Sequence, residues 1–172
     1  KQNNQWEQFG NNLENTSTGD IESISLSSDG SIIAIGGLYI NRGYDYNQRY
    51  VRIYQNQNDN WVQIGSDING ILFGGDYFGD SLQLSNDGKV IAIGVPQSHR
   101  DDPWFFGSGN AEVYEFNDET SQWSIIDKKL YGEGYLENSG SSISISGDGK
   151  RIAVGSPDPQ NKNDYGLTRV YE

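Results

Sequence analysis

The residues of this sequence that could do chemistry are few, and most of them are acidic. The chain has no cysteine, which excludes thiolate metal sites, thiol nucleophiles and disulfide bonds. Its single histidine, His99, is followed by Arg100, Asp101 and Asp102. With no second imidazole and no cysteine beside it, His99 is expected to be an exposed loop residue rather than a metal ligand or a general base. The Asp101-Asp102 pair could serve a glycosidase, which needs two carboxyl groups across a sugar, but nothing distinguishes it from a solvated acidic loop.

Three further aspartates recur at regular distances. Asp29, Asp87 and Asp148 are 58 and 61 residues apart, and each is followed by glycine. Asp-Gly is a reverse-turn signal, and one carboxylate per turn cannot supply the roughly six to eight oxygen ligands that calcium takes. We therefore expect these residues to form turns by hydrogen-bonding their own backbone, and we expect no calcium or other cofactor. Because no Gly-x-Ser-x-Gly nucleophile motif occurs either, the chain is predicted not to be an enzyme.

These aspartates belong to a repeat that covers the whole chain. One block carries the Asp-Gly turn, a second is a short segment ending in tyrosine, and a third begins with tryptophan. Such internal similarity indicates a repeat architecture. The blocks are SISLSSDGSIIAIG at 23–36, SLQLSNDGKVIAIG at 81–94 and SISISGDGKRIAVG at 142–155; VRIY at 51–54, AEVY at 111–114 and TRVY at 168–171; and the segments that start at Trp6, Trp61 and Trp123.

Each repeat predicts four β-strands, which we name a, b, c and d. In the first repeat, strand a (23–27) alternates apolar and polar residues, and strand b (32–36) is typical of a more fully buried strand. Strand c (51–54) alternates again, and strand d starts at Trp61. The prediction is an all-β fold of four-stranded antiparallel meanders. Because a lone sheet leaves both faces open, radial packing as blades of a β-propeller is favoured, with a β-sandwich or an open solenoid as the alternative.

We expect a single repeat array over 1–172, with blades at approximately 6–54, 61–114 and 123–171 and the strand order d-a-b-c in each. Known propellers have about four to eight blades, which is more than three. Two copies could form a six-bladed ring, or the chain could be a fragment of a larger propeller, and the missing initiator methionine favours the fragment. If the chain ends meet, the N-terminal tryptophan strand completes the last blade.

The second repeat is similar to a known family. YFGDSLQLSNDGKVIAIGVP at 77–96 resembles the FG-GAP repeat of integrin alpha-subunit propellers and of many microbial and viral surface proteins. Phe78-Gly79 matches the FG, and Gly94-Val95-Pro96 stands where the family has Gly-Ala-Pro, whereas the first repeat departs at both places. The calcium loop of many FG-GAP repeats is reduced here to the Asp-Gly turn. The resemblance implies a propeller, a role in adhesion, and an extracellular, cell-surface or virion-surface location.

Composition narrows the kinds of partner. Twenty-four acidic and twelve basic residues give a formal net charge of -12, and no cluster of lysine and arginine stands out. A phosphate footprint needs clustered positive charge, so we expect no nucleic acid partner and no anionic membrane surface. No apolar run reaches the roughly 18 residues that a membrane span requires, so no membrane-spanning segment is expected.

The long loops are the expected place for binding. In such a meander the d-to-a and b-to-c connections emerge on one rim and the short turns on the other. Loops 37–50, 95–109, 156–167, 66–79 and 128–140 share the first rim and carry most of the aromatic residues. Long loops on a rigid scaffold concentrate binding residues, and Tyr, Trp and Arg are common anchors. The candidate ligand-binding residues are Arg42, Tyr44, Tyr46, Tyr77, Arg100, Trp104, Phe105, Tyr135 and Tyr165.

Three functions are compatible with these features of the sequence. The leading one is a non-catalytic, surface-exposed module that binds a protein or glycan ligand through the aromatic loops, in adhesion or recognition. The alternative is a structural building block of a ring, filament or virion, which forms a homo-oligomer through its open blade edges. The third is a carbohydrate-active enzyme. The mass in solution separates the first two.

Overall fold

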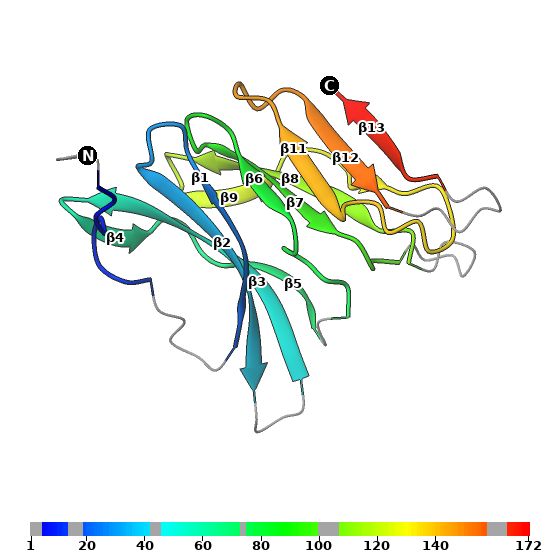
Figure 1. The fold of residues 1–172 in the computed structure, drawn as a ribbon, viewed down its shortest axis with the longest axis horizontal. Coiled ribbons are helices and arrows are strands. Elements are labelled where there is room, and N and C mark those ends of the chain that lie inside the picture. Colours follow the sequence, from blue (N-terminus) through cyan, green and yellow to red (C-terminus); the bar gives the residue numbers. More distant parts are fainter. Residues whose placement is uncertain (1–4, 14–18, 42–45, 73–74, 100–106, 158–164) are drawn as a thin grey trace.

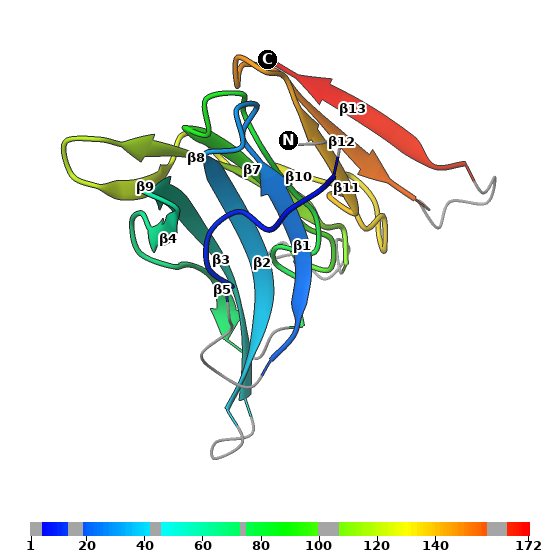
Figure 2. The ribbon, with the colours of Figure 1, turned by 60° about the vertical axis from the view of Figure 1, so that its left-hand side comes forward.

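The computed structural model describes residues 5–13, 19–41, 46–72, 75–99, 107–157 and 165–172. In these ranges the chain contains strands and turns and no helix. The strands form three antiparallel sheets, which stand side by side in the order of the sequence (Figure 1, Figure 2). The prediction of an all-β chain built from antiparallel sheets is therefore confirmed.

The first and second sheets share one plan. Three consecutive strands pair in order, and the outer edge of the third then pairs with two short strands, one after the other. The first of the two corresponds to the expected strand d, whereas the second lies in a segment that was expected to be a loop, 66–79 in the first sheet and 128–140 in the second. The first sheet contains β1 (Ile21–Leu26), β2 (Ile32–Asn41), β3 (Tyr46–Gln57), β4 (Asn60–Gln63) and β5 (Ile68–Leu72), and the second contains β6 (Leu82–Leu84), β7 (Val90–Val95), β8 (Asn110–Asn117), β9 (Gln122–Ile125) and β10 (Leu130–Tyr131).

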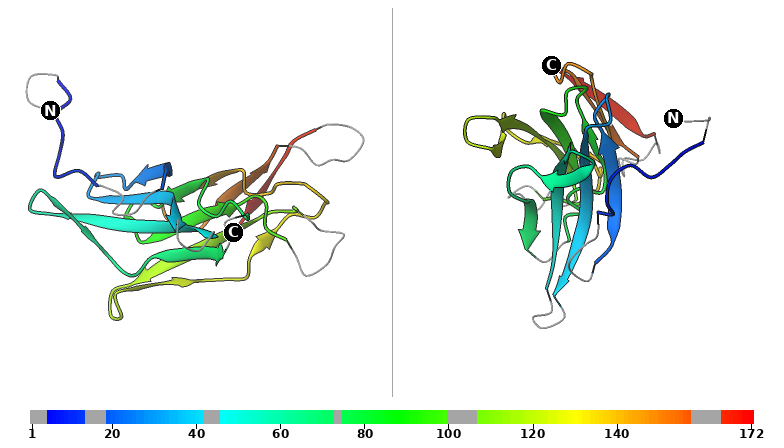
Figure 3. Two further views of the ribbon diagram at one scale, coloured as in Figure 1. Left: turned by 90° about the horizontal axis from the view of Figure 1, so that it is seen from below. Right: turned by 90° about the vertical axis from the view of Figure 1, so that its left-hand side faces the viewer.

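The third sheet is smaller, with the order β11 (Ser142–Ile145), β12 (Ile152–Ser156) and β13 (Leu167–Tyr171). The outer edge of β13 pairs with no strand among the described residues. Residues 5–13 contain no strand and lie at the other end of the row from β13 (Figure 1, Figure 3). Over the described ranges the three sheets thus form an open row, and the N-terminal tryptophan segment does not complete the last sheet of its own chain.

The connection between β2 and β3 is shorter than the sequence predicts. The loop expected at 37–50 is mostly a hairpin, because the two strands continue to pair from Gly37 opposite Tyr50 as far as Asn41 opposite Tyr46. Tyr46 therefore begins a strand instead of lying in a loop. Tyr50 is also in a strand and is only 3% exposed, so it belongs to the interior and not to a binding surface.

The hydrophobic core lies between the sheets. β6 carries Leu82 and Leu84, which pack against the buried Val51 and Ile53 of the first sheet. Ile145 of β11 packs in the same way among buried residues of the second sheet, including Ala92 and Ala111. Each interface is therefore made by strand a of one repeat, which lies closest to strands a and b of the repeat before it, and each sheet depends on its neighbour for burial.

The three Asp-Gly turns have the same hydrogen bonds, as predicted. In the first, the hydroxyl of Ser27 donates to Oδ1 of Asp29 at 2.7 Å, and the backbone N–H of Ser31 donates to the same oxygen at 2.9 Å. Asp87 and Asp148 accept the same two hydrogen bonds. One comes from the hydroxyl of the serine two residues before, and the other from the backbone N–H two residues after. These aspartates are turn formers, because their carboxylates are occupied by their own turns.

The turns are also joined from sheet to sheet. The backbone N–H of Ser28 donates to the carbonyl of Asn86, and the N–H of Asn86 donates to the carbonyl of Gly147, both at 2.9 Å. The backbones come close elsewhere too: a Cβ on Gly94 would lie 2.0 Å from the carbonyl oxygen of Gly140. The glycine is required there because a side chain would push the second and third sheets apart.

Candidate binding rim

The connections sort onto two edges of the row of sheets. The Asp-Gly turns lie along the upper edge in Figure 1, and strands β2, β7 and β12 end at the opposite edge. We call this opposite edge the loop rim. Segments 75–80 and 132–140, which connect one sheet to the next, also end at the loop rim.

The predicted binding residues have different outcomes. Arg42, Tyr44, Arg100, Trp104 and Phe105 lie outside the described residues. Tyr46 opens β3, as stated above. The remaining three are exposed: Tyr77 by 38%, Tyr135 by 51% and Tyr165 by 77%.

Tyr77 is held in an unusual position. Its φ of 58° lies in the left-handed region, which costs a non-glycine residue energy. The ring covers the guanidinium of Arg49, with 4.5 Å from Cζ to the ring centroid. Stacking of a cation on an aromatic face stabilises both groups. The half-exposed ring therefore sits on a fixed, buried base.

That base is a charged cluster between the first two sheets. Arg49, on β3, is buried and forms ion pairs with Glu22 of β1 and Asp80 of the segment before β6. Burial and the neighbouring Asp80 raise the pKa of Glu22, although the charge of Arg49 acts in the opposite direction. Two carboxylates share one guanidinium, so the surface around Tyr77 is acidic or neutral, and not cationic.

A second charged cluster supports the rim between the second and third sheets. Glu137 is 1% exposed and accepts hydrogen bonds from the backbone N–H of Glu133 at 2.7 Å and of Gly134 at 2.9 Å. The hydroxyl of Ser156 donates at 3.0 Å, and Arg169 forms an ion pair with the same carboxylate. Burial would raise the pKa of Glu137, but the bonds from Arg169, the Glu133 backbone and Ser156 outweigh it and hold the pKa below its usual value.

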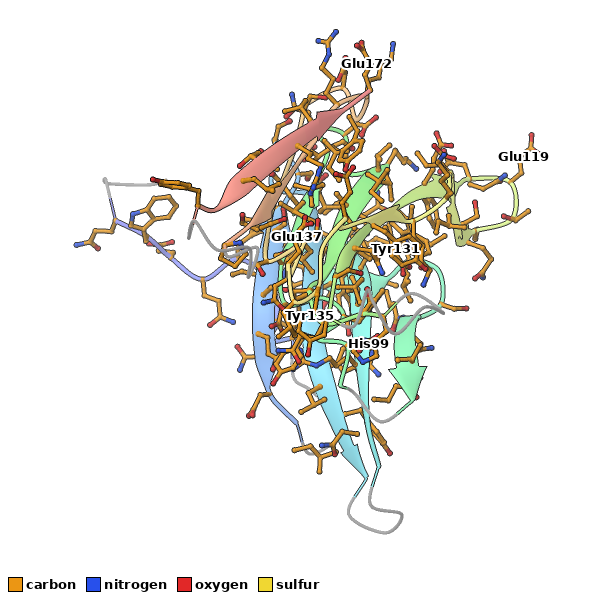
Figure 4. The ribbon with its side chains drawn as sticks, turned by 90° about the vertical axis from the view of Figure 1, so that its right-hand side faces the viewer. His99, Glu119, Tyr131, Tyr135, Glu137 and Glu172 are labelled. Carbon is orange, nitrogen blue, oxygen red and sulfur yellow. The ribbon has the colours of Figure 1, made fainter. Side chains whose placement is uncertain are left out.

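Sequence reasoning missed Glu137, because one glutamate in a polar loop gives no local sign of burial. Tyr135 projects from the loop that this carboxylate organises, and the two residues lie in one region of the molecule together with His99, away from Glu119 (Figure 4). His99 is exposed, as predicted, and its Nδ1 accepts a hydrogen bond from the backbone N–H of Gly107 at 3.0 Å. That bond assigns His99 a role in closing its own loop.

The two loops beside Tyr135 are joined by backbone hydrogen bonds. The N–H of Asn138 donates to the carbonyl of Gly107 at 3.1 Å, and the N–H of Ser139 donates to the carbonyl of Ser108 at 2.9 Å. The described part of the loop rim is thus a fixed surface that presents exposed tyrosine rings.

The described residues contain no group of three or more His, Cys, Asp or Glu side chains arranged to hold a metal ion. Within the same ranges there is also no helix long and apolar enough to cross a membrane.

Comparison with known proteins does not assign the chain to a family. No family model matches it, and no curated protein matches it. Among solved structures it is similar to hydrazine synthase from Kuenenia stuttgartiensis, with a TM-score of 0.40 and 12% sequence identity over 87% of this chain. The chain spans about half, 49%, of the length of that protein chain. A similarity this low carries no inference about function.

Proposed function

We propose that the chain is a set of β-propeller blades of the FG-GAP type that acts by binding and not by catalysis. Its ligand is a protein or a glycan, bound at the loop rim, and its place is outside the cell or on a virion surface. The observation that carries this proposal is Tyr77, a half-exposed ring that is fixed over a buried guanidinium in a backbone conformation unfavourable for tyrosine. Rigid aromatic rings lose little conformational entropy when a ligand covers them, which suits them as anchors.

The chemistry at the rim also favours a neutral ligand or a cationic one. The net charge of the chain is -12, and the arginines beside the tyrosines, Arg49 and Arg169, are already paired with carboxylates. Sugar rings stack on tyrosine through their apolar faces and tolerate acidic neighbours that accept hydrogen bonds from hydroxyl groups.

A glycan array tests the proposal with Tyr77→Asn as the key variant. Asn138 occupies the equivalent place in the next repeat with a φ of 52°, so asparagine suits this backbone and removes only the ring. We expect Tyr77→Asn to weaken binding of an array glycan about tenfold or more, in line with the loss of an interface anchor. Glu119→Gln, in the turn between β8 and β9, is the control and should leave binding unchanged.

An array with no bound glycan, or binding that both Tyr77→Asn and Tyr135→Ala leave intact, would overturn the glycan form of the proposal. Hydrolysis of an array glycan would overturn the non-catalytic assignment.

A second candidate function is a self-assembling structural unit. It is favoured by apolar side chains at the end of the row: Ile24 and Leu26 of β1 are 66% and 56% exposed, whereas their equivalents in the second sheet, Leu82 and Leu84, are 9% and 5% exposed.

A further inference from the structure

A cavity of about 120 Å³ lies between the second and third sheets, on the side away from the loop rim. Its walls are mostly apolar and include Val113, Ile126, Leu130, Ile152 and Tyr171. No residue described for this chain fills it.

The matching space between the first and second sheets is filled by a tryptophan. There Trp123, like Ile64 and Tyr114, packs against the buried core, and its indole N–H donates to the carbonyl of Ile64 at 3.2 Å. In the next repeat the residues equivalent to Ile64 and Tyr114 are Ile126 and Tyr171, which line the cavity. The cavity is therefore the Trp123 socket repeated one interface later, without its tryptophan.

The chain contains one further segment of the type that fills such a socket. Each fourth strand has an apolar residue three and seven positions after its tryptophan: Ile64 and Ile68 after Trp61, and Ile126 and Leu130 after Trp123. The N-terminal segment has the same pattern, with Phe9 and Leu13 after Trp6. The side chain of Trp6 is 88% exposed.

This segment already has the contacts of a fourth strand on one side. The indole N–H of Trp61 donates to the carbonyl of Phe9 at 3.2 Å, as Trp123 does to Ile64, and the two rings of Trp61 and Phe9 meet edge to face. Residues 5–13 thus lie against the first sheet as the fourth strand of a preceding sheet would lie. Among the described residues, no three-stranded sheet lies on that side for this segment to join.

The two ends of the row therefore match each other. On one end, Ile24 and Leu26 expose the face that Leu82 and Leu84 bury inside the row. On the other, Val170 of β13 is 68% exposed, whereas Ile53, its equivalent in the first sheet, is fully buried beneath the second sheet. Within the chain, β6 packs on the first sheet and β11 packs on the second sheet. The exposed face of β1 is equivalent to the faces that β6 and β11 use, and the exposed face of the third sheet is equivalent to the surfaces that receive them.

We propose that a second copy of the chain docks head to tail on the third sheet and donates residues 5–13, which pair with β13 as a fourth strand. Trp6 of the incoming copy fills the cavity, and its indole N–H donates to the carbonyl of Ile126. This proposal rests on the self-assembly function proposed above and names the surfaces that form the contact. The loop rim takes no part in it. Such a head-to-tail contact closes into a ring or continues as a filament.

The internal repeats fix the register of this strand. Ile125 lies opposite Tyr114, the N–H of Ile126 donates to the carbonyl of Val113, and Leu130 lies opposite Ala111. By equivalence Gln8 of the incoming copy lies opposite Tyr171, the N–H of Phe9 donates to Val170, and Leu13 lies opposite Thr168.

Sedimentation velocity over a wide concentration range tests the docking. The wild-type chain should reach at least twice its monomer mass of 19.1 kDa. Trp6→Ala and Val170→Lys should remain monomeric, and Ile71→Lys, at a site on β5 that is 62% exposed, should assemble like the wild type. Thermal unfolding of the monomeric forms should differ little, because both side chains are exposed in the single chain. A wild type that stays monomeric, or a Trp6→Ala variant that assembles normally, overturns the proposal.

Engineered cysteines test the register, because the natural chain has none. Oxidation of the Gln8→Cys, Tyr171→Cys double variant should link one chain to the next. Gln8→Cys with Val170→Cys should not, because neighbouring residues of a strand point to opposite faces. Equal crosslinking of both pairs overturns the register. Tyr77→Asn should leave the mass unchanged, so failure of assembly and failure of ligand binding at the rim are separate results.

Discussion

Arg52 of β3 and Asp67, just before β5, form a two-pronged contact in which Nε and Nη2 of the arginine each donate to Oδ2 of the aspartate at 2.9 Å. The second sheet has Glu112 and Lys129 at the same two places, with the signs of the charges exchanged, and they also form an ion pair at 2.6 Å. Both sheets place opposite charges at these two positions, and both orders of the charges occur.

Exchange of the two charges in the first sheet should therefore be tolerated. Arg52→Glu or Asp67→Lys alone should lower the free energy of unfolding by about 1 to 3 kcal/mol, because each leaves two like charges partly buried together. The double variant should recover most of that loss, as measured by urea unfolding in a double-mutant cycle. Arg151 and Glu172, an exposed pair, give the control, since their exchange should change stability by less than about 1 kcal/mol. Additive losses at Arg52 and Asp67 would show that the charges do not interact.

Glu137 should make the protein sensitive to acid. Its pKa in the folded chain is lowered, so its stabilising contribution is present above the pKa of an unfolded glutamate and is lost as the pH falls through the folded pKa. Glu137→Gln should thus be less stable than the wild type near pH 7, with the difference shrinking below about pH 4. Unfolding curves at a series of pH values measure this difference. A constant gap at every pH would contradict the charged role of Glu137.

The Asp-Gly turns predict a titration. Hydrogen bonds from the backbone of Ser31 and from the hydroxyls of Ser27 and Ser31 lower the pKa of Asp29 to about 2. NMR titration of the carboxyl carbons should place Asp29 at that value, and Ser27→Ala should raise it. The same variant should leave the lowered pKa of Asp87 unchanged, because Asp87 has its own serine, Ser85. An Asp29 that titrates near the usual value of about 3.9 would show that the turn does not hold these bonds in solution.

Close packing of the sheets predicts a strong effect at Gly94. Gly94→Ala places a methyl group 2.0 Å from the carbonyl oxygen of Gly140, so the second and third sheets must separate. We expect a loss of about 1 to 3 kcal/mol in the free energy of unfolding. Gly75→Ala is the matched control, because nothing lies within 4 Å of its added Cβ. It should be neutral or slightly stabilising, and equal effects of the two changes would argue against the close approach.

The local features of the fold were predictable from the sequence. The strands around Asp87 and the turn itself depend on neighbouring residues, so the alternating pattern and the Asp-Gly signal were sufficient. Tyr50 was misassigned to a loop because only the continued pairing with β2 shows that it is in a strand. Strand β5, which lies within the expected loop 66–79, could not be foreseen either, since it is defined by its pairing with distant residues of β3.

The candidate site was less predictable than the fold. Tyr77, Tyr135 and Tyr165, three of the candidate binding residues, are exposed, because tyrosine in a long polar loop has few apolar neighbours to cover it. The charged groups beneath them, Arg49 and Glu137, were not found, since each is paired with residues more than 20 positions away. In the aligned repeats Glu112 stands where the first repeat has Arg52, and this change of charge was a sequence signal that the position takes part in an ion pair.

The hydrogen bonds between the turns join each position to its own counterpart one repeat later: Ser28 to Asn86, and Asn86 to Gly147. The indole groups of Trp61 and Trp123 also bond to the preceding repeat, each to the residue three positions after its counterpart, Phe9 and Ile64. A gene duplication of one repeat would therefore copy both halves of every contact at once. The array can gain or lose units during evolution without a compensating substitution, and copy number is free to vary while the interfaces stay the same.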